Sequence, residues 1–297
     1  MSPRHVWVDG RLLPADGTHL SAFDRGFQLG DAIFETLRAR AGRPTELDEH
    51  VARLERSAAG LGMRLPADIR TTLATALRDL LAVEDLDGPA GDAALRITVS
   101  RGISTGRGLL PVDETAPTVV VQAWPVVPPP AAWLEHGIHV VSSRVRRDPA
   151  SPLVALKTTS RADYVYARLE ARAAGADDAL FLTLDGHLSE ATSANLFLIR
   201  GEELATPSLD CAILPGTTRD WILGWARTVG LRPHEGVLRP EDLAAADEAF
   251  LSSSVAGIVP VTRFDGEPIA TGRPGPWTLR ARADRERMVR AEAPAAD

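Results

Sequence analysis

The first part of the chain shows the hydrophobic patterns of both strands and helices. Residues 6–8 and 11–13 are two short, mainly apolar runs on either side of an Asp-Gly turn, which is typical of a hairpin. Apolar residues recur at helical spacing over 47–65 and again over 67–82, and they predict two helices. Two runs rich in Val and Ile predict strands, at 95–100 and 118–123. This part of the chain therefore predicts a small mixed domain.

A proline-rich stretch, residues 124–130, follows and predicts a stiff linker, because proline can continue neither a helix nor a central strand. The second half mixes the two patterns without a regular alternation of strand and helix. Its predicted strands are 138–142, 179–184, 195–200, 250–253 and 259–261, and its predicted helices are 161–174, 218–229 and 277–289. The chain therefore indicates an α+β fold with a small domain over 1–124, a linker over 125–135 and a larger domain over 136–297.

Composition excludes several classes of function. The 297 residues carry a formal net charge of −7, which argues against nucleic acid or an anionic membrane as the main partner. No apolar run is long enough to span a membrane, and residues 1–10 lack the apolar core of a signal peptide, so a cytoplasmic location is expected. The single cysteine, Cys211, cannot form an internal disulfide, and the 7 histidines follow no metal-binding pattern, so no metal is expected.

Lysine usage is far from ordinary. Of the 33 basic residues, one, Lys157, is lysine and the other 32 are arginine. Either this lysine survived a bias towards arginine by chance, or its position requires a primary amine. Arginine stays protonated in proteins and its guanidinium forms no Schiff base, whereas the amine of lysine can lose its proton and condense with an aldehyde. The second hypothesis makes Lys157 the first candidate for catalysis.

Four further signals suit a phosphorylated pyridine, although each has an ordinary structural explanation. Residues 215–218 (PGTT) precede a predicted helix, whose N–H groups and hydroxyls either bind a phosphate or merely cap the helix. Residues 252–254 (SSS) offer hydroxyls or only a polar loop. Glu190 would keep a pyridine nitrogen protonated, or it is a cap or surface acid. Arg53 either reaches a phosphate or faces solvent. Together they include the groups that a pyridoxal phosphate site requires.

Several motifs along the chain resemble those of the fold type IV pyridoxal-phosphate enzymes, or class IV aminotransferases. This family includes branched-chain, D-amino acid and (R)-amine transaminases and aminodeoxychorismate lyases. The resemblance covers nearly the whole chain. It rests on residues 24–31 (DRGFQLGD), 34–36 (FET), 50–54 (HVARL), Lys157, Glu190 with 195–197 (NLF), 214–219 (LPGTTR) and 250–254 (FLSSS).

The resemblance implies a role for each of these positions. Lys157 would form the Schiff base with pyridoxal 5′-phosphate and move a proton between substrate and cofactor, and Glu190 would pair with the pyridine nitrogen. The implied phosphate ligands are Arg53, Thr217, Thr218 and Ser254. The implied fold has a small N-terminal and a larger C-terminal domain with the cofactor in the cleft between them, and the implied active unit is a homodimer.

The substrate depends on weaker signals. The implied substrate-binding residues are Phe34, Arg38, Arg107 and Ser253. D-amino acid transaminases carry Arg-x-His in the loop that grips the substrate carboxylate, whereas this chain has Gly-Arg-Gly around Arg107, in a loop (100–108) closer to that of the lyases. Residues 252–261 are closer to transaminases, and residues 157–160 lack the Lys-x-x-Asn often seen in lyases.

We therefore expect a transaminase that takes an amino group from an amino acid, with D-amino acids slightly favoured, and passes it to 2-oxoglutarate or pyruvate. Arg107, or else Arg38, would bind a carboxylate through a bidentate contact. A 4-amino-4-deoxychorismate lyase and a branched-chain L-amino acid aminotransferase remain alternatives, because lyase and transaminase reactions begin with the same proton abstraction by Lys157. A scaffold without chemistry is disfavoured by the joint presence of Lys157 and Glu190.

Overall fold

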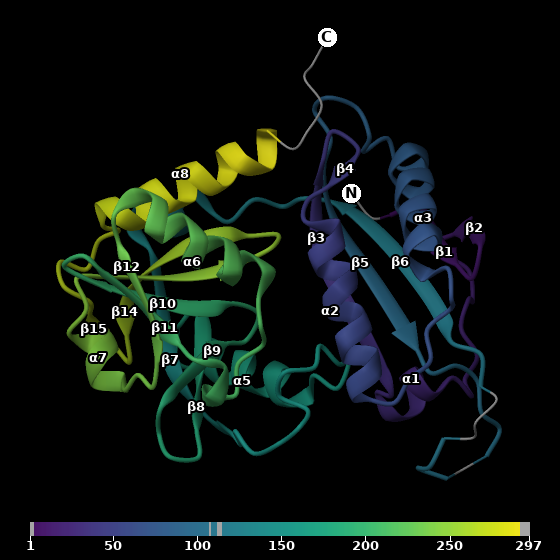
Figure 1. The fold of residues 1–297 in the computed structure, drawn as a ribbon, viewed down its shortest axis with the longest axis horizontal. Coiled ribbons are helices and arrows are strands. Elements are labelled where there is room, and N and C mark those ends of the chain that lie inside the picture. Colours follow the sequence, from purple (N-terminus) through teal and green to yellow (C-terminus); the bar gives the residue numbers. More distant parts are fainter. Residues whose placement is uncertain (1–2, 107, 112–114, 292–297) are drawn as a thin grey trace. The chain divides into compact units, whose positions relative to one another are not determined.

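The computed structural model describes residues 3–106, 108–111 and 115–291 (Figure 1). The chain divides into two compact units. The first comprises the described residues up to Val127, the segment Leu156–Ser160 and the end of the last helix from Val289. The second comprises Pro128–Ala155 and Arg161–Met288. Lys157 therefore belongs to the first unit, although the chain on both sides of its segment belongs to the second.

The first unit is built on a six-stranded antiparallel sheet with the strand order β2-β1-β6-β5-β3-β4. Its strands are β1 (His5–Val8), β2 (Arg11–Pro14), β3 (Ala32–Arg40), β4 (Arg43–Pro44), β5 (Asp92–Ser100) and β6 (Thr118–Pro125). Its helices are α1 (Arg25–Leu29), α2 (Leu47–Gly60) and α3 (Ile69–Val83). Helices α2 and α3 lie on one face of the sheet (Figure 1).

One hydrophobic core joins this face of the sheet to the two helices. Leu37 of β3 and Leu95 of β5 pack in the same cluster as Leu54 of α2 and Leu77 of α3, and all four side chains are fully buried. Because side chains alternate along a strand, the residues next to Leu37 and Leu95 in β3 and β5 point to the other face. The first unit thus has one face for its core and a second face that carries polar side chains.

The second unit is built on a nine-stranded mixed sheet with the order β12-β11-β10-β13-β14-β7-β8-β9, and β15 pairs with β14. Its strands are β7 (Ile138–Arg147), β8 (Asp178–Thr183), β9 (Leu188–Ala191), β10 (Asn195–Arg200), β11 (Glu203–Pro207), β12 (Arg232–Gly236), β13 (Glu248–Ser253), β14 (Gly257–Phe264) and β15 (Glu267–Pro268). Its helices are α4 (Ala131–His136), α5 (Ala162–Ala173), the 3-10 turn Leu209–Cys211, α6 (Thr217–Val229), α7 (Pro240–Ala244) and α8 (Pro276–Ala291).

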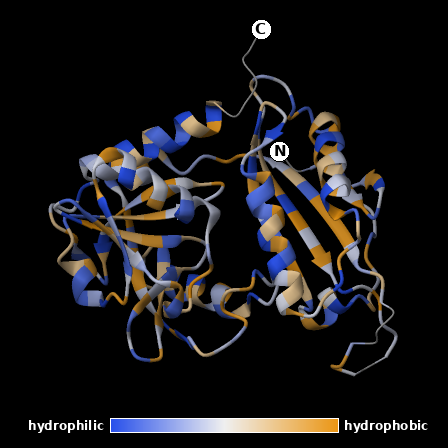
Figure 2. Ribbon diagram, viewed as in Figure 1, coloured by the Kyte–Doolittle hydropathy of each residue, from blue (hydrophilic) through white to orange (hydrophobic). Residues whose placement is uncertain are grey.

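Both faces of this sheet are covered. The stacked rings of Phe197 and Phe250, 5.1 Å apart, pack with Ile222 of α6, whereas their neighbours Leu196 and Leu251 belong to a separate cluster. A strand that is buried on both faces needs apolar residues at nearly every position. Figure 2 accordingly shows the strands of this sheet largely in the hydrophobic colours.

The α+β fold class predicted from the sequence is confirmed, and each predicted strand and helix is present with shifted ends. Two details differ. Strand β6 continues through Trp124 to Pro125, because a proline at the last position of a strand interrupts no further ladder bonds. Helix α4 occupies part of the stretch predicted to be a linker.

The sequence patterns also missed α1, β3 and β4, which follow the N-terminal hairpin, and β9, β11, β12, α7 and β15 of the second unit. Strand β3 lies between β5 and β4 in the sheet and carries Phe34 and Glu35. Among the described residues, no helix combines the length and the apolar character needed to cross a bilayer.

Candidate active site

Lys157 lies in a short segment that pairs with strand β3 of the first unit. The main-chain N–H of Phe34 donates to the carbonyl of Lys157 (2.9 Å), and the N–H of Thr159 donates to the carbonyl of Ala32 (2.9 Å). The N–H of Lys157 itself donates to Oγ of Ser57 in α2 (3.1 Å). The main chain of Lys157 is therefore fixed by a strand and a helix, and only its side chain keeps freedom to move.

The amine of Lys157 lies beside an aromatic ring and a second cation. Its Nζ is 4.7 Å from the centroid of the Phe34 ring, and the guanidinium carbon of Arg96 is 4.0 Å from the same centroid. Phe34 and Arg96 come from the neighbouring strands β3 and β5, whose register pairs Phe34 with Thr98. Two cations on one ring make this place suitable for an anion. Sequence reasoning placed the strand 95–100 in the substrate pocket but did not single out Arg96, because only the strand register brings it to Phe34.

Glu35 follows Phe34 and points to the opposite face of β3, where it meets α2. Its carboxylate accepts hydrogen bonds from Nε (2.9 Å) and Nη2 (2.6 Å) of Arg53 and from Nδ1 of His50 (2.7 Å). All three side chains are almost completely buried. The structure thus places Arg53, a predicted phosphate ligand, in a bidentate ion pair inside the first unit.

The pairing keeps Glu35 ionised in a place where burial opposes charge. Burial alone would raise the pKa of this carboxyl group, but the hydrogen bonds from Arg53 and His50 and their positive charges outweigh it and lower the pKa from 4.5 to about 2. Glu35 in turn holds the planar guanidinium of Arg53 in one orientation.

Arg38, a predicted substrate ligand, lies four residues beyond Phe34 on β3. Four residues of strand span about 13 Å. The guanidinium of Arg38 binds Asp92 through two contacts, from Nε (2.7 Å) and from Nη2 (2.6 Å). Of the two predicted substrate-binding residues on β3, the structure therefore brings Phe34 to Lys157 and engages Arg38 in an ion pair further along the strand.

A buried arginine anchors the loop that follows β5. Arg25 donates from Nε to Asp31 (2.8 Å) and from Nη1 to the carbonyl of Gly108 (3.1 Å). Arg101 also donates to Asp31 (2.7 Å). Burial would raise the pKa of Asp31, but the two arginines lower it. Arg107, the predicted carboxylate ligand, lies outside the described residues.

Glu190, on β9 of the second unit, is a buried carboxylate with several donors. Its Oε2 accepts from the main-chain N–H of Leu214 (3.0 Å) and from Nδ2 of Asn195 (3.3 Å). Its Oε1 forms an ion pair with Nη2 of Arg147 (3.6 Å). These contacts favour the ionised form of Glu190, which is the form that can accept a hydrogen bond from a protonated nitrogen.

Two arginines enclose Tyr164 next to Glu190. Nη1 of Arg147 donates to the hydroxyl of Tyr164, and the guanidinium carbon of Arg161 lies 3.2 Å from the centroid of the Tyr164 ring. Burial raises the pKa of Tyr164 and the negative charge of Glu190 adds to the rise, so the hydroxyl stays protonated and can donate. Sequence reasoning missed these residues, because no local pattern connects Arg147 on β7 to Glu190 on β9.

The N-terminus of α6 presents donors without a side-chain cap. Gly216 is the capping residue and, because it has no side chain, it provides no side-chain cap to the first N–H groups of the helix. A Cβ at Gly216 would lie 2.1 Å from Oδ1 of Asn195, so only glycine fits there. The hydroxyls of Thr217 and Ser254 are 3.4 Å apart, and Thr218 follows in the first turn. N–H groups and hydroxyls at a helix N-terminus suit a phosphate.

Two buried polar atoms close to Glu190 and Asn195 have no hydrogen-bond partner within the described part of the chain. They are Nε of Arg147 and Oγ of Ser252. Arg147 pairs with Glu190, and Ser252 lies opposite Asn195 in the register of β13 and β10. Ser253, a predicted substrate ligand, is the next residue on β13 and is half-buried. Unpartnered donors of this kind are expected where a polar ligand binds.

The predicted cofactor residues fall into two groups. Arg53 and Lys157 belong to the first unit, and Glu190, Thr217, Thr218 and Ser254 belong to the second. Within the second unit, the contacts of Asn195 connect Glu190 to the start of α6, since Asn195 also donates to the carbonyl of Leu214 (3.0 Å).

Comparisons with known proteins show which proteins the chain is similar to. The family model described as amino-transferase class IV matches residues 32–264. A putative branched-chain-amino-acid aminotransferase of Methanocaldococcus jannaschii is 33% identical over 92% of both chains. An aminodeoxychorismate lyase of Bacillus subtilis is 33% identical over 88% of this chain and 86% of its own. A D-alanine aminotransferase of Bacillus licheniformis is 30% identical over 92% of this chain and 93% of its own.

A solved structure shows the same fold. It is a branched-chain amino acid aminotransferase of T.th. with pyridoxamine 5′-phosphate, and it has a TM-score of 0.89. The two chains are 26% identical, and the match covers 99% of this chain and 96% of that one.

The ion cluster around Glu35 yields a prediction on stability. Glu35→Gln is expected to lower the free energy of unfolding by about 3–5 kcal/mol at neutral pH, because Arg53 stays buried without an ionised partner. Since the folded pKa is about 2 and the ordinary value is 4.5, this contribution is full above the ordinary value and disappears as the pH falls towards the folded one. Urea unfolding of both proteins at several pH values measures the difference.

Glu55→Gln provides the control, because Glu55 forms an exposed ion pair with Arg70 (2.6 Å) and should contribute far less. Equal losses in the two variants, or a Glu35→Gln effect that does not shrink towards acid pH, would contradict the assignment.

Proposed function

The chain belongs to the class IV aminotransferases, and on that premise we propose that it transfers the amino group of an amino acid to 2-oxoglutarate or pyruvate, with D-amino acids as the preferred donors. Pyridoxal 5′-phosphate is the cofactor, as in its family. The observation that carries the proposal is Lys157, the one lysine of the chain, whose main chain is fixed by β3 and Ser57.

The residues of the second unit fit this cofactor. The uncapped start of α6, with Thr217, Thr218 and Ser254, offers donors to a phosphate. Glu190 offers an ionised carboxylate to a pyridine nitrogen. The unpartnered Nε of Arg147 offers a further donor close to Glu190.

The bound cofactor supplies an aldehyde that condenses with amines and a ring that withdraws electrons. The carboxylate of Glu190 would accept a hydrogen bond from the protonated pyridine nitrogen and so keep that nitrogen positively charged. The amine of Lys157 would hold the cofactor and, when free, would take the proton from Cα of the donor and return it as a general acid. Arg53, oriented by Glu35, serves the phosphate as a fixed cation.

Arg96 is the group we propose for the substrate carboxylate. It shares the Phe34 ring with Nζ of Lys157, so an acid bound by its guanidinium lies beside the amine that moves the proton. Sequence reasoning assigned this role to Arg107, or else to Arg38, and the guanidinium of Arg38 binds Asp92.

A second candidate function is the cleavage of 4-amino-4-deoxychorismate. It is supported by the similarity to the Bacillus subtilis lyase, because this lyase and the branched-chain relative of Methanocaldococcus jannaschii are both 33% identical to the chain. Lys157 would begin this reaction with the same proton abstraction, and the products would be pyruvate and 4-aminobenzoate.

We also propose that two copies of the chain form the active unit. Large apolar side chains stand exposed around α1, with Phe23 52%, Phe27 76% and Ile103 53% exposed. Phe23 and Ile103 are close neighbours, because Asp24 and Ile103 form a β-bridge. A patch of this kind suits a second copy, as the resemblance to a homodimeric family implies.

Removal of the amine is the first test. Lys157→Arg keeps the positive charge but cannot condense with an aldehyde, so amino transfer is expected to fall roughly a thousandfold or more. Borohydride reduction of the holoenzyme, followed by peptide mass spectrometry, should place the pyridoxyl group on the peptide that contains Lys157. A label at the N-terminal amine instead, or full activity of the variant, would refute the role.

A donor panel tests the substrate. D-alanine is expected to donate to 2-oxoglutarate faster than L-leucine, and Arg96→Gln should raise KM for the donor roughly tenfold with a smaller effect on kcat. Arg43→Gln, an exposed arginine of the same sheet, is the control. Turnover of L-leucine alone would contradict the D preference, and release of 4-aminobenzoate from aminodeoxychorismate would favour the lyase.

Light scattering coupled to size-exclusion chromatography tests the dimer. The wild type should elute with twice the chain mass of 31.8 kDa, and Phe27→Asp should shift it towards a single chain, because a charge there opposes burial. A monomeric wild type with full activity would contradict this proposal.

A further inference from the structure

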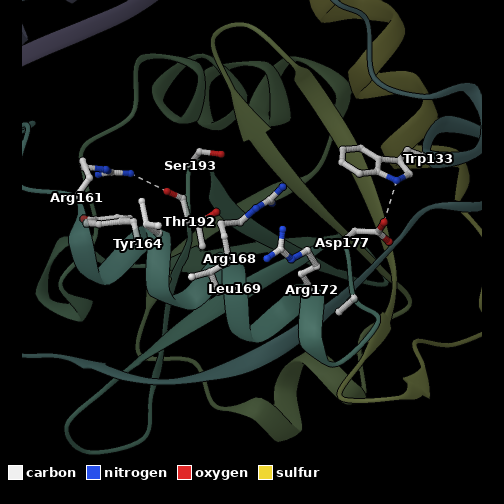
Figure 3. Close-up of a pocket in the computed structure, with 11 residues that line it drawn as sticks. Trp133, Arg161, Tyr164, Arg168, Leu169, Arg172, Asp177, Thr192 and Ser193 are labelled. Atoms are coloured by element: carbon white, nitrogen blue, oxygen red, sulfur yellow. Dashed lines mark hydrogen bonds between the residues drawn. The ribbon is translucent and has the colours of Figure 1, made fainter.

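A pocket of about 680 Å³ opens along the outer face of helix α5 in the second unit (Figure 3). Its wall includes Arg168, Leu169 and Arg172 of α5, together with Trp133 of α4 and Ser193 of the turn before β10. The opposite face of α5 carries Ala167 and Ala171, which pack on the sheet. The helix thus turns its small residues inward and its arginines into the pocket.

Two guanidinium groups stand close together in this pocket. Arg168 and Arg172 are one helical turn apart, and Figure 3 shows both side chains rising from α5 on the same side. Like charges at this spacing destabilise a helix slightly, whereas an anion between them removes the repulsion. A forked guanidinium also matches a carboxylate geometrically.

The acidic groups of the wall are already engaged. Asp177 accepts hydrogen bonds from Nε1 of Trp133 (3.0 Å) and from the N–H of His139 (2.9 Å). Asp178 pairs with Arg168 (2.9 Å) and accepts from Thr192 (2.6 Å).

Arg172 differs from its neighbour. Within residues 3–106, 108–111 and 115–291, the structure shows neither an ion pair nor a side-chain hydrogen bond for Arg172. Three arginines, Arg161, Arg168 and Arg172, thus line the pocket, with Asp177 in its wall and Asp178 next to it. The local charge is therefore positive in a protein whose formal net charge is −7.

Part of the wall is apolar. Val165 and Leu169 are 59% and 46% exposed, although both are large aliphatic residues. The half-buried Trp133 is held in place by its bond to Asp177. An apolar floor beside a pair of guanidinium groups suits a ligand that has one negative end and one apolar body.

We propose that this pocket binds a small organic carboxylate with an apolar body, as a site separate from the amino-transfer chemistry. Arg168 and Arg172 take the carboxylate, while Leu169, Val165 and Trp133 contact the apolar part. The occupant also touches the wall formed by Arg161, whose Nη2 donates to the carbonyl of Thr192 (2.7 Å) and whose guanidinium covers Tyr164. A ligand in this pocket would therefore contact residues that surround Glu190.

Indole-3-acetate is a suitable probe, because it combines a carboxylate with an apolar ring system. Isothermal titration of the holoenzyme should show binding, while tryptophol, which has a hydroxyl in place of the carboxylate, and inorganic phosphate, which has no apolar part, should bind at least roughly tenfold more weakly. Arg172→Gln should weaken the binding of indole-3-acetate roughly tenfold, and Leu169→Asp should abolish this binding by repelling the carboxylate.

Two controls separate this site from the proposed active site. Arg56→Gln, an exposed arginine on α2, should leave binding unchanged. Lys157→Ala abolishes the proposed amino transfer but should leave the affinity for indole-3-acetate intact. Equal binding by wild type, Arg172→Gln and Leu169→Asp would overturn the proposal, as would loss of binding in Lys157→Ala alone.

Discussion

The pairing of strand β3 with the segment Leu156–Ser160 is the constraint on which the active site depends. Two main-chain hydrogen bonds between them, together with the bond from Lys157 to Ser57, hold the lysine at one position of the sheet. Because side chains alternate along β3, the same strand also places two neighbouring residues on opposite faces of the sheet. Phe34 turns to the face where the amine lies, and Glu35 turns inward to hold Arg53.

Both units use the same physical means to keep charge inside the protein. Glu35 in the first unit and Glu190 in the second are buried carboxylates, and each is surrounded by donors that favour the ionised form. A buried ion pair contributes little net stability, because desolvation offsets the attraction. Each carboxylate instead orients an arginine, because the guanidinium groups of Arg53 and Arg147 are held in place by Glu35 and Glu190.

The arginines of the chain have different roles in these clusters. Some arginines have structural partners, such as Arg38 with Asp92, and Arg25 with Asp31 and the loop beyond β5. Others lie where we propose that a ligand carboxylate binds, such as Arg96 beside Lys157 and Arg172 on α5. The composition of the chain does not distinguish the 32 arginines from one another, because the role of each depends on which acidic group lies nearby.

The sequence alone determined the chemistry of the protein and most of its elements. One lysine among 33 basic residues singled out Lys157, and apolar patterns predicted the longer helices and strands such as β5, β7 and β10. It failed at β3, whose segment was noticed only as a motif. Tertiary structure decided that Arg96 meets Phe34, that Arg147 and Tyr164 surround Glu190, and that Arg38 is engaged by Asp92. The reason is that a local pattern records which face of an element is apolar, whereas the partner of a polar side chain depends on strand register and on contacts between residues far apart in the chain.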